Sequence, residues 1–397
     1  MPRDEWYDMI QQFQFSKTPS IYFGVSASGK LPSLTASLGM RALLITGKSS
    51  FAAAGLQNRL MEHLRDTLAD VRIVSVSGEP SPEIIDGAVQ RFSSDKIDVV
   101  AAIGGGSVID AGKAIAAMLP TGGTVIDYLE GVGGRTHSGA RLPFIAVPTT
   151  AGTGSEATKN AVISRVGPGG FKASLRHDNF TPDIAIVDPA LTISCPPAIT
   201  AACGMDALSQ LLESFVSSKA APLTDALAPA AIKGIFDHIV KATSDGGDIG
   251  ARSAMAYGAL ISGMCLANAG LGVVHGLASP LGARVSIPHG VVCALLCAPA
   301  FKITINRLTA EKNTAPLLKL AQIGSLISGG NSGDIDGCCA LLVEKLYALA
   351  GALGIPKLRA YGIGLSDVDS IAAKASNKNN PVALTKNEMR EILAEAL

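Results

Sequence analysis

Two histidines, each followed directly by glycine, are the side chains best suited to chemistry in this sequence. His275 and His289 belong to a set of only six histidines in 397 residues. His275 falls in a segment expected to be helical, and Pro288 should break that helix and start another at His289. Imidazoles presented in this way could converge on one metal ion. The pair therefore suggests a metal site, which needs further ligands.

Asp206 and Gln210 are the next candidates. They lie four residues apart on a helix expected to begin at Pro196-Pro197, so they point from the same face. A lone aspartate is usually a helix cap or a structural hydrogen-bond acceptor, but Asp206 lies well past the start of this helix. Its neighbours are apolar, and a buried carboxylate needs a cation or hydrogen-bond donors. Beside the two histidines, metal ligation becomes the better explanation.

A run of three glycines indicates where a phosphate could bind. Gly104, Gly105 and Gly106 follow an expected strand, and a helix should begin near Ser107. Glycine allows close approach of the backbone, and the new helix offers free N–H groups and its positive dipole end. The alternative is an ordinary tight turn. The run is neither a P-loop nor a GxGxxG fingerprint.

Gly47 closes the preceding expected strand and bears on the choice of dinucleotide. An acidic residue there would bind the adenosine ribose and repel a 2′-phosphate. Here glycine is followed by Lys48 and Ser49, a combination that could accept a 2′-phosphate. These are otherwise plain turn residues. The pattern favours NADP over NAD.

A second loop, residues 148–156, is rich in hydroxyls and glycine and again follows an expected strand. Its Thr149 and Thr150 are candidates for hydrogen bonds to a cofactor. Lys172, on a following segment, could meet a phosphate or a ribose; the default for any single lysine is a solvated surface position.

The order of elements predicts two domains. Residues 1–190 alternate strands and helices, which is typical of a doubly wound, mostly parallel sheet. Residues 191–397 show only helical spacing. The expected strands cover residues 20–24, 41–46, 71–76, 97–103, 142–147 and 183–187, and the later expected helices cover 196–217, 223–240, 251–269, 291–306, 314–327, 335–353 and a last one capped at Thr385.

Composition excludes some partners. Lys+Arg and Asp+Glu number 33 each, so no electrostatic footprint for nucleic acid or an anionic membrane is present. Residues 253–283 carry no charged side chain, but Ser262, Asn268 and His275 interrupt their apolar character. We therefore expect buried helix rather than a membrane span. Seven cysteines without a spacing framework predict buried free thiols in a reducing compartment, which favours a soluble, cytoplasmic protein.

Four motifs in order resemble the iron-containing (group III) alcohol dehydrogenase family. They are Gly104-Gly105-Gly106-Ser107 with Asp110, residues 148–153, residues 204–208 around Asp206, and His275 with Pro288-His289-Gly290. The ending Asn380-Pro381 with Leu384-Thr385 also fits, and the similarity covers nearly the whole chain.

The resemblance implies an NAD(P)-dependent enzyme that interconverts alcohols and aldehydes or ketones. It implies the dehydroquinate synthase-like architecture, with a dinucleotide-binding α/β domain, an all-α domain and the active site between them, and a homodimer. It also implies a divalent ion, Fe²⁺ or Zn²⁺, with Asp206, His275 and His289 as ligands and catalytic residues. Gly105, Gly106 and Ser107 would meet the cofactor phosphates. The positions that would line the dinucleotide are Thr149, Thr150, Thr158, Asn160, Lys172, Leu191 and Cys195.

Two departures fall in the expected catalytic centre. The family's second histidine ligand is here Gln210, which offers at most a weak carbonyl oxygen, and the histidine often assigned to proton relay is here Ser279. Three protein ligands still suffice for a catalytic zinc. The serine hydroxyl cannot replace imidazole near neutral pH. The smaller side chain could admit a bulkier or more polar substrate.

Three readings therefore stay open. The first is a metal-dependent dehydrogenase or aldehyde reductase. The second is a metal-independent reductase resembling maleylacetate reductases; its acidic substrate would need nearby cations, and no Arg/Lys cluster is obvious around 206–289. The third is a non-catalytic cofactor-binding or scaffold protein, against which the intact loop at 104–107 argues.

Overall fold

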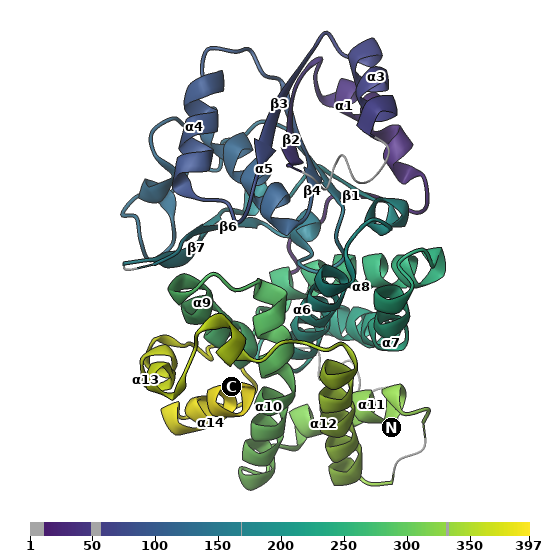
Figure 1. The fold of residues 1–397 in the computed structure, drawn as a ribbon, viewed down its shortest axis with the longest axis vertical. Coiled ribbons are helices and arrows are strands. Elements are labelled where there is room, and N and C mark those ends of the chain that lie inside the picture. The colour runs from purple at the N-terminus through teal and green to yellow at the C-terminus, as the bar shows by residue number, and fades with distance from the viewer. Residues whose placement is uncertain (1–11, 49–56, 168, 331–332) are drawn as a thin grey trace.

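The computed structural model describes residues 12–48, 57–167, 169–330 and 333–397. Figure 1 shows an α/β region above and a helical region below, joined by the chain around residue 190. The last strand ends at Val187, the short 3-10 helix η6 (Pro189–Thr192) follows, and the first long helix of the lower region begins at Pro197. The expected division near residue 190 thus lies in η6. Ser49, one of the expected cofactor residues, lies outside the described residues.

The α/β region contains a six-stranded parallel sheet. Its strands are β1 (Ser20–Phe23), β2 (Arg41–Gly47), β3 (Asp70–Val76), β4 (Val99–Gly104), β5 (Phe144–Pro148) and β8 (Ile184–Val187). Their order in the sheet is β1-β8-β5-β4-β2-β3, and every pairing is parallel. The expected strands are confirmed, and parallel pairing explains why they read as continuous apolar runs.

Helices cover both faces of this sheet. Leu43 and Ile45 of β2 pack with α4 (Pro82–Phe92) and α5 (Gly106–Met118). Leu44 between them faces the other way, toward α1 (Leu31–Leu38) and α3 (Gln57–Thr67). The alternation of side chains along a strand thus divides the core into two layers. The doubly wound fold is confirmed.

One strand pair stands apart from the main sheet. β6 (Asn160–Arg165) and β7 (Phe171–Arg176) form an antiparallel hairpin. In both views the hairpin lies at the lower border of the α/β region, above α9. The sequence analysis did not separate these two strands, although they carry Asn160 and Lys172. The hairpin therefore brings two expected cofactor residues to the border with the helical region.

Nine helices make up the second region within the described residues. They are α6 (Pro197–Val216), α7 (Pro222–Ser244), α8 (Ile249–Ala269), α9 (Val273–Arg284), α10 (His289–Ala310), α11 (Thr314–Ile327), α12 (Ile335–Ala352), α13 (Leu365–Lys374) and α14 (Lys386–Ala396). Their apolar faces form one continuous core. Thr385 caps α14 in the expected capping box with Glu388. The all-helical second region is confirmed.

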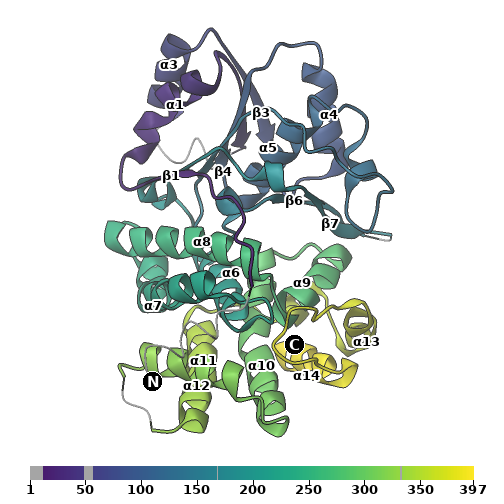
Figure 2. The same ribbon diagram turned by 180° about the vertical axis from the view of Figure 1, so that it is seen from behind.

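The segment before β1 ties the two regions together. In Figure 2 it descends from β1 across the helical region. The backbone N–H of Ser16 donates a hydrogen bond to the side-chain oxygen of Asn268 on α8, and Lys159 donates to the Ser16 hydroxyl. The N-terminal segment thus contacts both walls of the border between the regions.

Among the described residues one helix, α10, is long and apolar enough to cross a membrane, and 78% of its apolar window is buried inside the protein. The uncharged stretch 253–283 forms α8 and α9, which meet at a bend of 99°. Both helices contribute to the helical core, as the sequence analysis expected of this stretch.

Candidate metal and cofactor site

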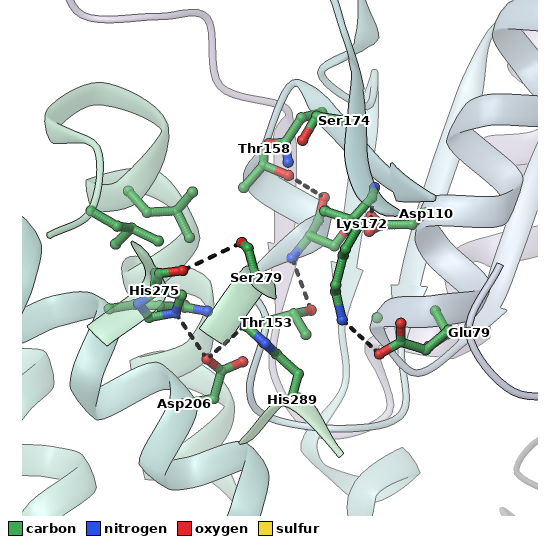
Figure 3. Close-up of a pocket in the computed structure, with 18 of the residues that line it drawn as sticks. Glu79, Asp110, Thr153, Thr158, Lys172, Ser174, Asp206, His275, Ser279 and His289 are labelled. Carbon is green, nitrogen blue, oxygen red and sulfur yellow. Dashed lines mark hydrogen bonds and ion pairs between the residues drawn. The ribbon is translucent and has the colours of Figure 1, made fainter. Parts of the chain in front are cut away.

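Three helices of the lower region bring the expected metal ligands together. Asp206 comes from the middle of α6, His275 from the first turn of α9, and His289 is the first residue of α10. The Oδ1 atom of Asp206 lies 3.3 Å from His275 Nε2 and 3.7 Å from His289 Nε2. Figure 3 shows the three side chains pointing toward one another. The Cys293 thiol lies beside these three side chains. The potential ligand atoms of the four residues, one from each, lie within 4.8 Å of one another.

The glycines that follow both histidines have a structural reason. A Cβ atom on Gly276 would lie 1.5 Å from the carbonyl oxygen of Ser376, and one on Gly290 would lie 2.2 Å from that of Ala202. No larger residue fits at either position without moving the backbone. The two His-Gly pairs therefore mark points where α9 and α10 pack closely against other segments and hold the imidazoles in place.

A tight turn sets the direction of α9. Gly270 ends α8 with φ 70° and ψ −178°, a conformation essentially restricted to glycine. A Cβ on Gly272 would lie 2.6 Å from the side-chain oxygen of Asn380 and 3.0 Å from Oε1 of Glu213. Two glycines thus allow the bend that points the first turn of α9, with His275, at α6.

Glu213 on α6 fixes the orientation of His275. Its Oε2 atom lies 2.6 Å from His275 Nδ1, and its Oε1 accepts the N–H of Val274 at 2.6 Å. Because an ionised carboxylate only accepts, Nδ1 carries the proton and Nε2 faces Asp206. A carboxylate behind an imidazole is the usual support of a metal-binding histidine. The sequence analysis missed Glu213, although a residue seven after Asp206 lies on the same helical face.

The electrostatics of the cluster favour a cation. Burial opposes ionisation of Asp206, but the imidazoles of His289 and His275 hold its pKa below the ordinary value. Burial lowers the pKa of His289 to about 4. Burial acts in the same direction on His275, but Cys293, Asp206 and Glu213 raise its pKa well above the ordinary value. A positive charge is thus favoured between the buried acidic groups, which suits a divalent ion bound with release of protons.

Gln210 and Ser279, the two departures from the family pattern, both line the same cavity as this cluster. Gln210 is buried, and its carbonyl oxygen accepts a hydrogen bond from Ser262 at 2.7 Å. Ser279 is exposed to the cavity one turn after His275, and its hydroxyl donates to the His275 carbonyl at 3.4 Å. The Gln210 oxygen is therefore already engaged, and Ser279 leaves open space beside the histidines.

The cavity between the two regions has a volume of about 310 Å³. Its helical wall includes Asp206, His275 and His289. Its α/β wall includes five of the expected cofactor residues, namely Gly106, Ser107, Thr158, Asn160 and Lys172. The expected metal ligands and much of the expected cofactor site therefore open into one space.

The N-terminus of α5 forms one part of this wall. Gly105 is the N-cap residue, and the first N–H groups of a helix have no acceptor within it. A Cβ on Gly106 would lie 2.5 Å from Cγ2 of Thr153, and one on Gly104 would lie 2.6 Å from Cβ of Val108. Glycine is thus required by packing, and it leaves the backbone open toward the cavity.

The loop after β5 lies against this turn. The N–H of Thr149 donates to the carbonyl of Gly104 at 2.9 Å, and a Cβ on Gly105 would meet the Thr150 hydroxyl at 3.3 Å. The Thr149 hydroxyl is buried without a hydrogen-bond partner. Both threonines therefore support the glycine turn from behind rather than lining the cavity itself.

Lys113 organises the next part of the wall. This fully buried side chain on α5 donates to the Thr158 hydroxyl at 3.0 Å and to the carbonyl oxygens of Ser155 and Asn160 at 2.9 and 2.7 Å. Burial lowers its pKa to about 8. The sequence analysis did not single out Lys113, because a lysine within an apolar helix carries no spacing signal for its distant partners.

Lys172 is an ion-paired residue of the cavity wall. Its side chain is 10% exposed, and Nζ lies 2.7 Å from Oε1 of Glu79. Figure 3 shows the two side chains joined by this contact. Glu79 also accepts from the Ser164 hydroxyl at 2.6 Å. Burial opposes ionisation of Glu79, but Lys172 holds its pKa below the ordinary value. Glu79 lies just after β3 and was not expected from the sequence.

Three further expected cofactor residues lie outside the cavity wall. Gly47 ends β2, partly buried, with exposed Lys48 after it. Leu191 lies in η6 and packs against the sheet. The carbonyl of Cys195 accepts a hydrogen bond from Arg252 at 3.2 Å. The structure thus brings part of the expected cofactor set to the cavity wall, and these three residues are not part of that wall.

A doubly wound sheet with a glycine-rich strand-to-helix turn, facing a buried carboxylate and two imidazoles, is typical of a dinucleotide-dependent oxidoreductase that uses a metal. Comparison with protein families agrees. Residues 18–189 match the iron-containing alcohol dehydrogenases, and residues 200–397 match the C-terminal domain of the Fe-containing alcohol dehydrogenase family. The chain belongs to the iron-containing alcohol dehydrogenase family, and it is an alcohol dehydrogenase by class.

Individual relatives support the assignment. The chain is 35% identical over 387 residues to long-chain-alcohol dehydrogenase 1 of Geobacillus thermodenitrificans, covering 95% of each chain. A crystal structure of 1,3-propanediol oxidoreductase matches with a TM-score of 0.88 at 31% identity, covering 98% of this chain and 100% of the other. Two further relatives, each 31% identical over at least 96% of both chains, are named as an NAD-dependent methanol dehydrogenase of Bacillus methanolicus and an NADPH-dependent butanol dehydrogenase of Clostridium saccharobutylicum.

Proposed function

We propose that this enzyme transfers a hydride between NAD(P)(H) and a small alcohol, aldehyde or ketone in the cavity between its two regions. Asp206, His275 and His289 hold a divalent ion there. One observation carries the proposal: the cavity that contains these three side chains also contains the N-terminus of α5. We divide the chain accordingly into a dinucleotide-binding domain, residues 1–190, and a metal and substrate domain, residues 191–397.

The residues around the cavity fit both a divalent ion and the pyrophosphate of a dinucleotide. One buried carboxylate and two imidazole nitrogens are a usual donor set for Zn²⁺ or Fe²⁺. The glycines at 104–106 allow a pyrophosphate to approach free N–H groups, and Ser107 adds a hydroxyl. When bound, the divalent ion would polarise the substrate carbonyl and the nicotinamide would carry the hydride.

The protein's own groups position and shield the reaction. Glu213 holds His275 with Nε2 toward the cavity, while Asp206 lies between the two histidines. In the opposite wall, Lys113 donates to the Thr158 hydroxyl and to the backbone carbonyl of Asn160 and fixes both positions. Preorganised side chains of this kind need no rearrangement during the reaction. Ser279 cannot hold a proton as an imidazole does, because its hydroxyl is far from titrating near neutral pH; we assign it a role in leaving room for substrate.

A specific test follows for Ser279. Ser279→His refills the space beside His275, so the range of accepted alcohols and aldehydes should narrow toward smaller ones. Specificity constants across an aldehyde series of increasing size measure this, with Ser37→His on the exposed face of α1 as the matched control. An unchanged range would count against the role assigned to Ser279.

The cavity wall argues against the metal-independent reductase of an acidic substrate. Its lysine and its arginine, Lys172 and Arg176, each form an ion pair, with Glu79 at 2.7 Å and with Glu130 at 3.3 Å. Among the lining residues, no unpaired lysine or arginine is therefore left for the carboxylates of an oxo-acid. This wall suits an uncharged alcohol or carbonyl compound.

For the dinucleotide we propose NADP(H) ahead of NAD(H). Gly47 ends β2 without an acidic side chain, and Lys48 next to it is exposed. Relatives named as NAD-dependent and as NADPH-dependent both occur, so the family alone leaves the preference open. Lys48→Glu should shift the preference toward NADH, as measured by kcat/KM for each dinucleotide; an unchanged ratio would exclude Lys48 from cofactor choice.

We further propose a homodimer that acts in the cytoplasm. Within the described residues β1 is an edge strand whose one partner is β8, and it exposes Ile21 and Phe23, with Val25 just beyond. An exposed apolar edge strand is a ready surface for a second copy. Light scattering should give twice the chain mass, and Phe23→Asp should reduce it to the single-chain mass.

The activity itself is tested with purified protein. Oxidation of NADPH and of NADH is followed against a panel of small aldehydes and ketones, and reduction of the oxidised cofactors against the matching alcohols. Turnover of at least one such pair supports the proposal. Binding of the dinucleotide without turnover of any pair would favour the non-catalytic reading.

A further inference from the structure

Cys293 lies beside the candidate metal ligands in a position that the family resemblance does not assign. It comes four residues after His289 on α10 and is fully buried. Its Sγ atom lies 3.6 Å from His275 Nε2 and 3.7 Å from His289 Nε2. Residues four apart on a helix share one face, so the backbone of α10 presents the imidazole and the thiol to the same point.

Four distances within the cluster are close to those between the ligands of a tetrahedral ion. With Zn–N or Zn–O bonds of about 2.0 Å and a Zn–S bond of about 2.3 Å, an N/O pair lies about 3.3 Å apart and an N/S pair about 3.5 Å apart. The Asp206 oxygen lies 3.3 and 3.7 Å from the two imidazole nitrogens, and the thiol sulfur lies 3.6 and 3.7 Å from them. Cys293 therefore occupies the position of a fourth ligand.

The cluster has an open and a closed side. Asp206, His275 and His289 line the cavity, whereas Cys293 is not part of its wall. The thiol thus approaches from the protein interior. A sulfur bound there would leave the cavity side free for the substrate oxygen, as a catalytic site requires.

We propose that Cys293 is a thiolate ligand of the metal and replaces the donor that Gln210 does not supply. The carbonyl oxygen of Gln210 is already bonded to Ser262, whereas the thiol faces both imidazoles. The resulting Asp-His-His-Cys set contains a soft sulfur donor, which favours Zn²⁺ over a hard, oxygen-preferring ion. Binding releases the thiol proton, and the carboxylate and thiolate together balance the two positive charges of the ion. The inference rests on the metal site of the proposed function.

Cobalt(II) reports directly on a bound thiolate. Protein stripped of metal is titrated with Co²⁺, and the absorption spectrum is recorded. The wild-type complex should show a sulfur-to-cobalt charge-transfer band in the near ultraviolet. Cys293→Ser should lose this band while keeping the weaker visible bands of bound cobalt. Cys297→Ser is the matched control, because Cys297 is an equally buried thiol one turn further along α10 and lies outside the cluster; it should keep the band.

A second measurement needs no variant. X-ray absorption of the zinc-loaded wild-type protein should show one sulfur at about 2.3 Å among nitrogen and oxygen neighbours. Competition with a zinc-binding dye should also show Cys293→Ser, and Cys293→Ala if the first variant folds poorly, binding zinc at least about tenfold more weakly.

The possible outcomes distinguish a failure of the role proposed for Cys293 from a failure of the proposed metal site itself. Cobalt or zinc bound to the wild-type protein without a charge-transfer band and without a sulfur neighbour would overturn the role of Cys293 and leave the Asp-His-His site standing. Failure of the wild-type protein to bind either ion would overturn both. Loss of the band in Cys297→Ser rather than in Cys293→Ser would show that Cys297 supplies the thiolate and would overturn the proposal.

Discussion

The two walls of the cavity are built by different means. The α/β wall offers backbone: glycines at 104–106, a helix N-terminus and a supporting loop. The helical wall offers buried side chains, with Asp206, His275 and His289 held by Glu213 and by close helix contacts. A phosphate is recognised by dipoles that any residue carries, whereas a metal needs particular atoms at particular places. Loss of one donor atom from the helical wall, called the side-chain wall below, should therefore cost more activity than a change at one glycine of the α/β wall, called the backbone wall.

The largest effect is expected on the side-chain wall, at Asp206. Asp206→Asn keeps the shape but removes the charge that neutralises the ion. Loss of Lewis-acid assistance worth several kcal/mol should lower kcat by about 10³-fold or more. Steady-state assays and metal content measure this, and Asp225→Asn on α7 is the control. Retention of both metal and activity would remove Asp206 from the ligand set.

Glu213 should show a smaller effect on the same wall. Glu213→Gln removes the negative charge and leaves one acceptor oxygen where two now serve His275 Nδ1 and the Val274 N–H, so the ring is held less firmly. Metal affinity should fall about 10- to 100-fold, with Glu344→Gln on exposed α12 surface as the control. If Glu213 served only the fold, thermal stability would fall while the metal affinity of the folded protein stayed unchanged.

The backbone wall is tested at Gly106. Gly106→Ala brings a Cβ to 2.5 Å from Cγ2 of Thr153, so the loop after β5 must move away from the turn. The dissociation constant for the dinucleotide should rise about tenfold, equal to roughly 1.4 kcal/mol, while metal content stays unchanged. Gly87→Ala on α4 meets no atom within 4 Å and should alter neither. A fall in metal content in Gly106→Ala would show that the two walls are not independent.

The smallest effect is expected at a buried carboxyl group where the two regions of the molecule meet. Glu156, in η4 (Ser155–Ala157), is buried, and burial raises its pKa to about 7. The folded state therefore keeps this proton at pH values where the unfolded chain has lost it. Stability conferred by Glu156 is complete below pH 4.5 and falls as the pH rises through about 7.

Replacing Glu156 by glutamine removes that titration. Glu156→Gln should be more stable relative to the wild type at pH 8 than at pH 5, by an amount on the order of 1 kcal/mol. Urea unfolding at the two pH values measures the difference. Equal differences at both pH values would show that Glu156 does not titrate in this range.

The parts of the fold and site that could be predicted from the sequence are those marked by a pattern within one helix, strand or turn. Strand-to-helix alternation predicted the doubly wound sheet, and the rarity of histidine with the position of Pro288 predicted the cluster of His275 and His289. Asp206 followed from a carboxylate within an apolar helix. These signals lie within one element or at its end, where spacing determines direction.

The remaining parts depend on contacts between distant elements. Glu213 and Cys293 share helical faces with Asp206 and His289, but only the packing of α6, α9 and α10 shows that they reach the same imidazoles. Glu79 meets Lys172 because the β6–β7 hairpin folds beside the end of β3. No periodicity encodes such pairings. Ser49 lies outside the described residues, so its place in the site stays a prediction.

The central claim is that the side-chain wall holds a catalytic divalent ion. Metal content and NADPH-linked aldehyde reduction are measured on the same protein before chelation, after chelation and after zinc or iron is restored. The account predicts one ion per chain, loss of turnover when the ion is removed and recovery when it returns. Full turnover in protein shown to contain no metal would contradict it.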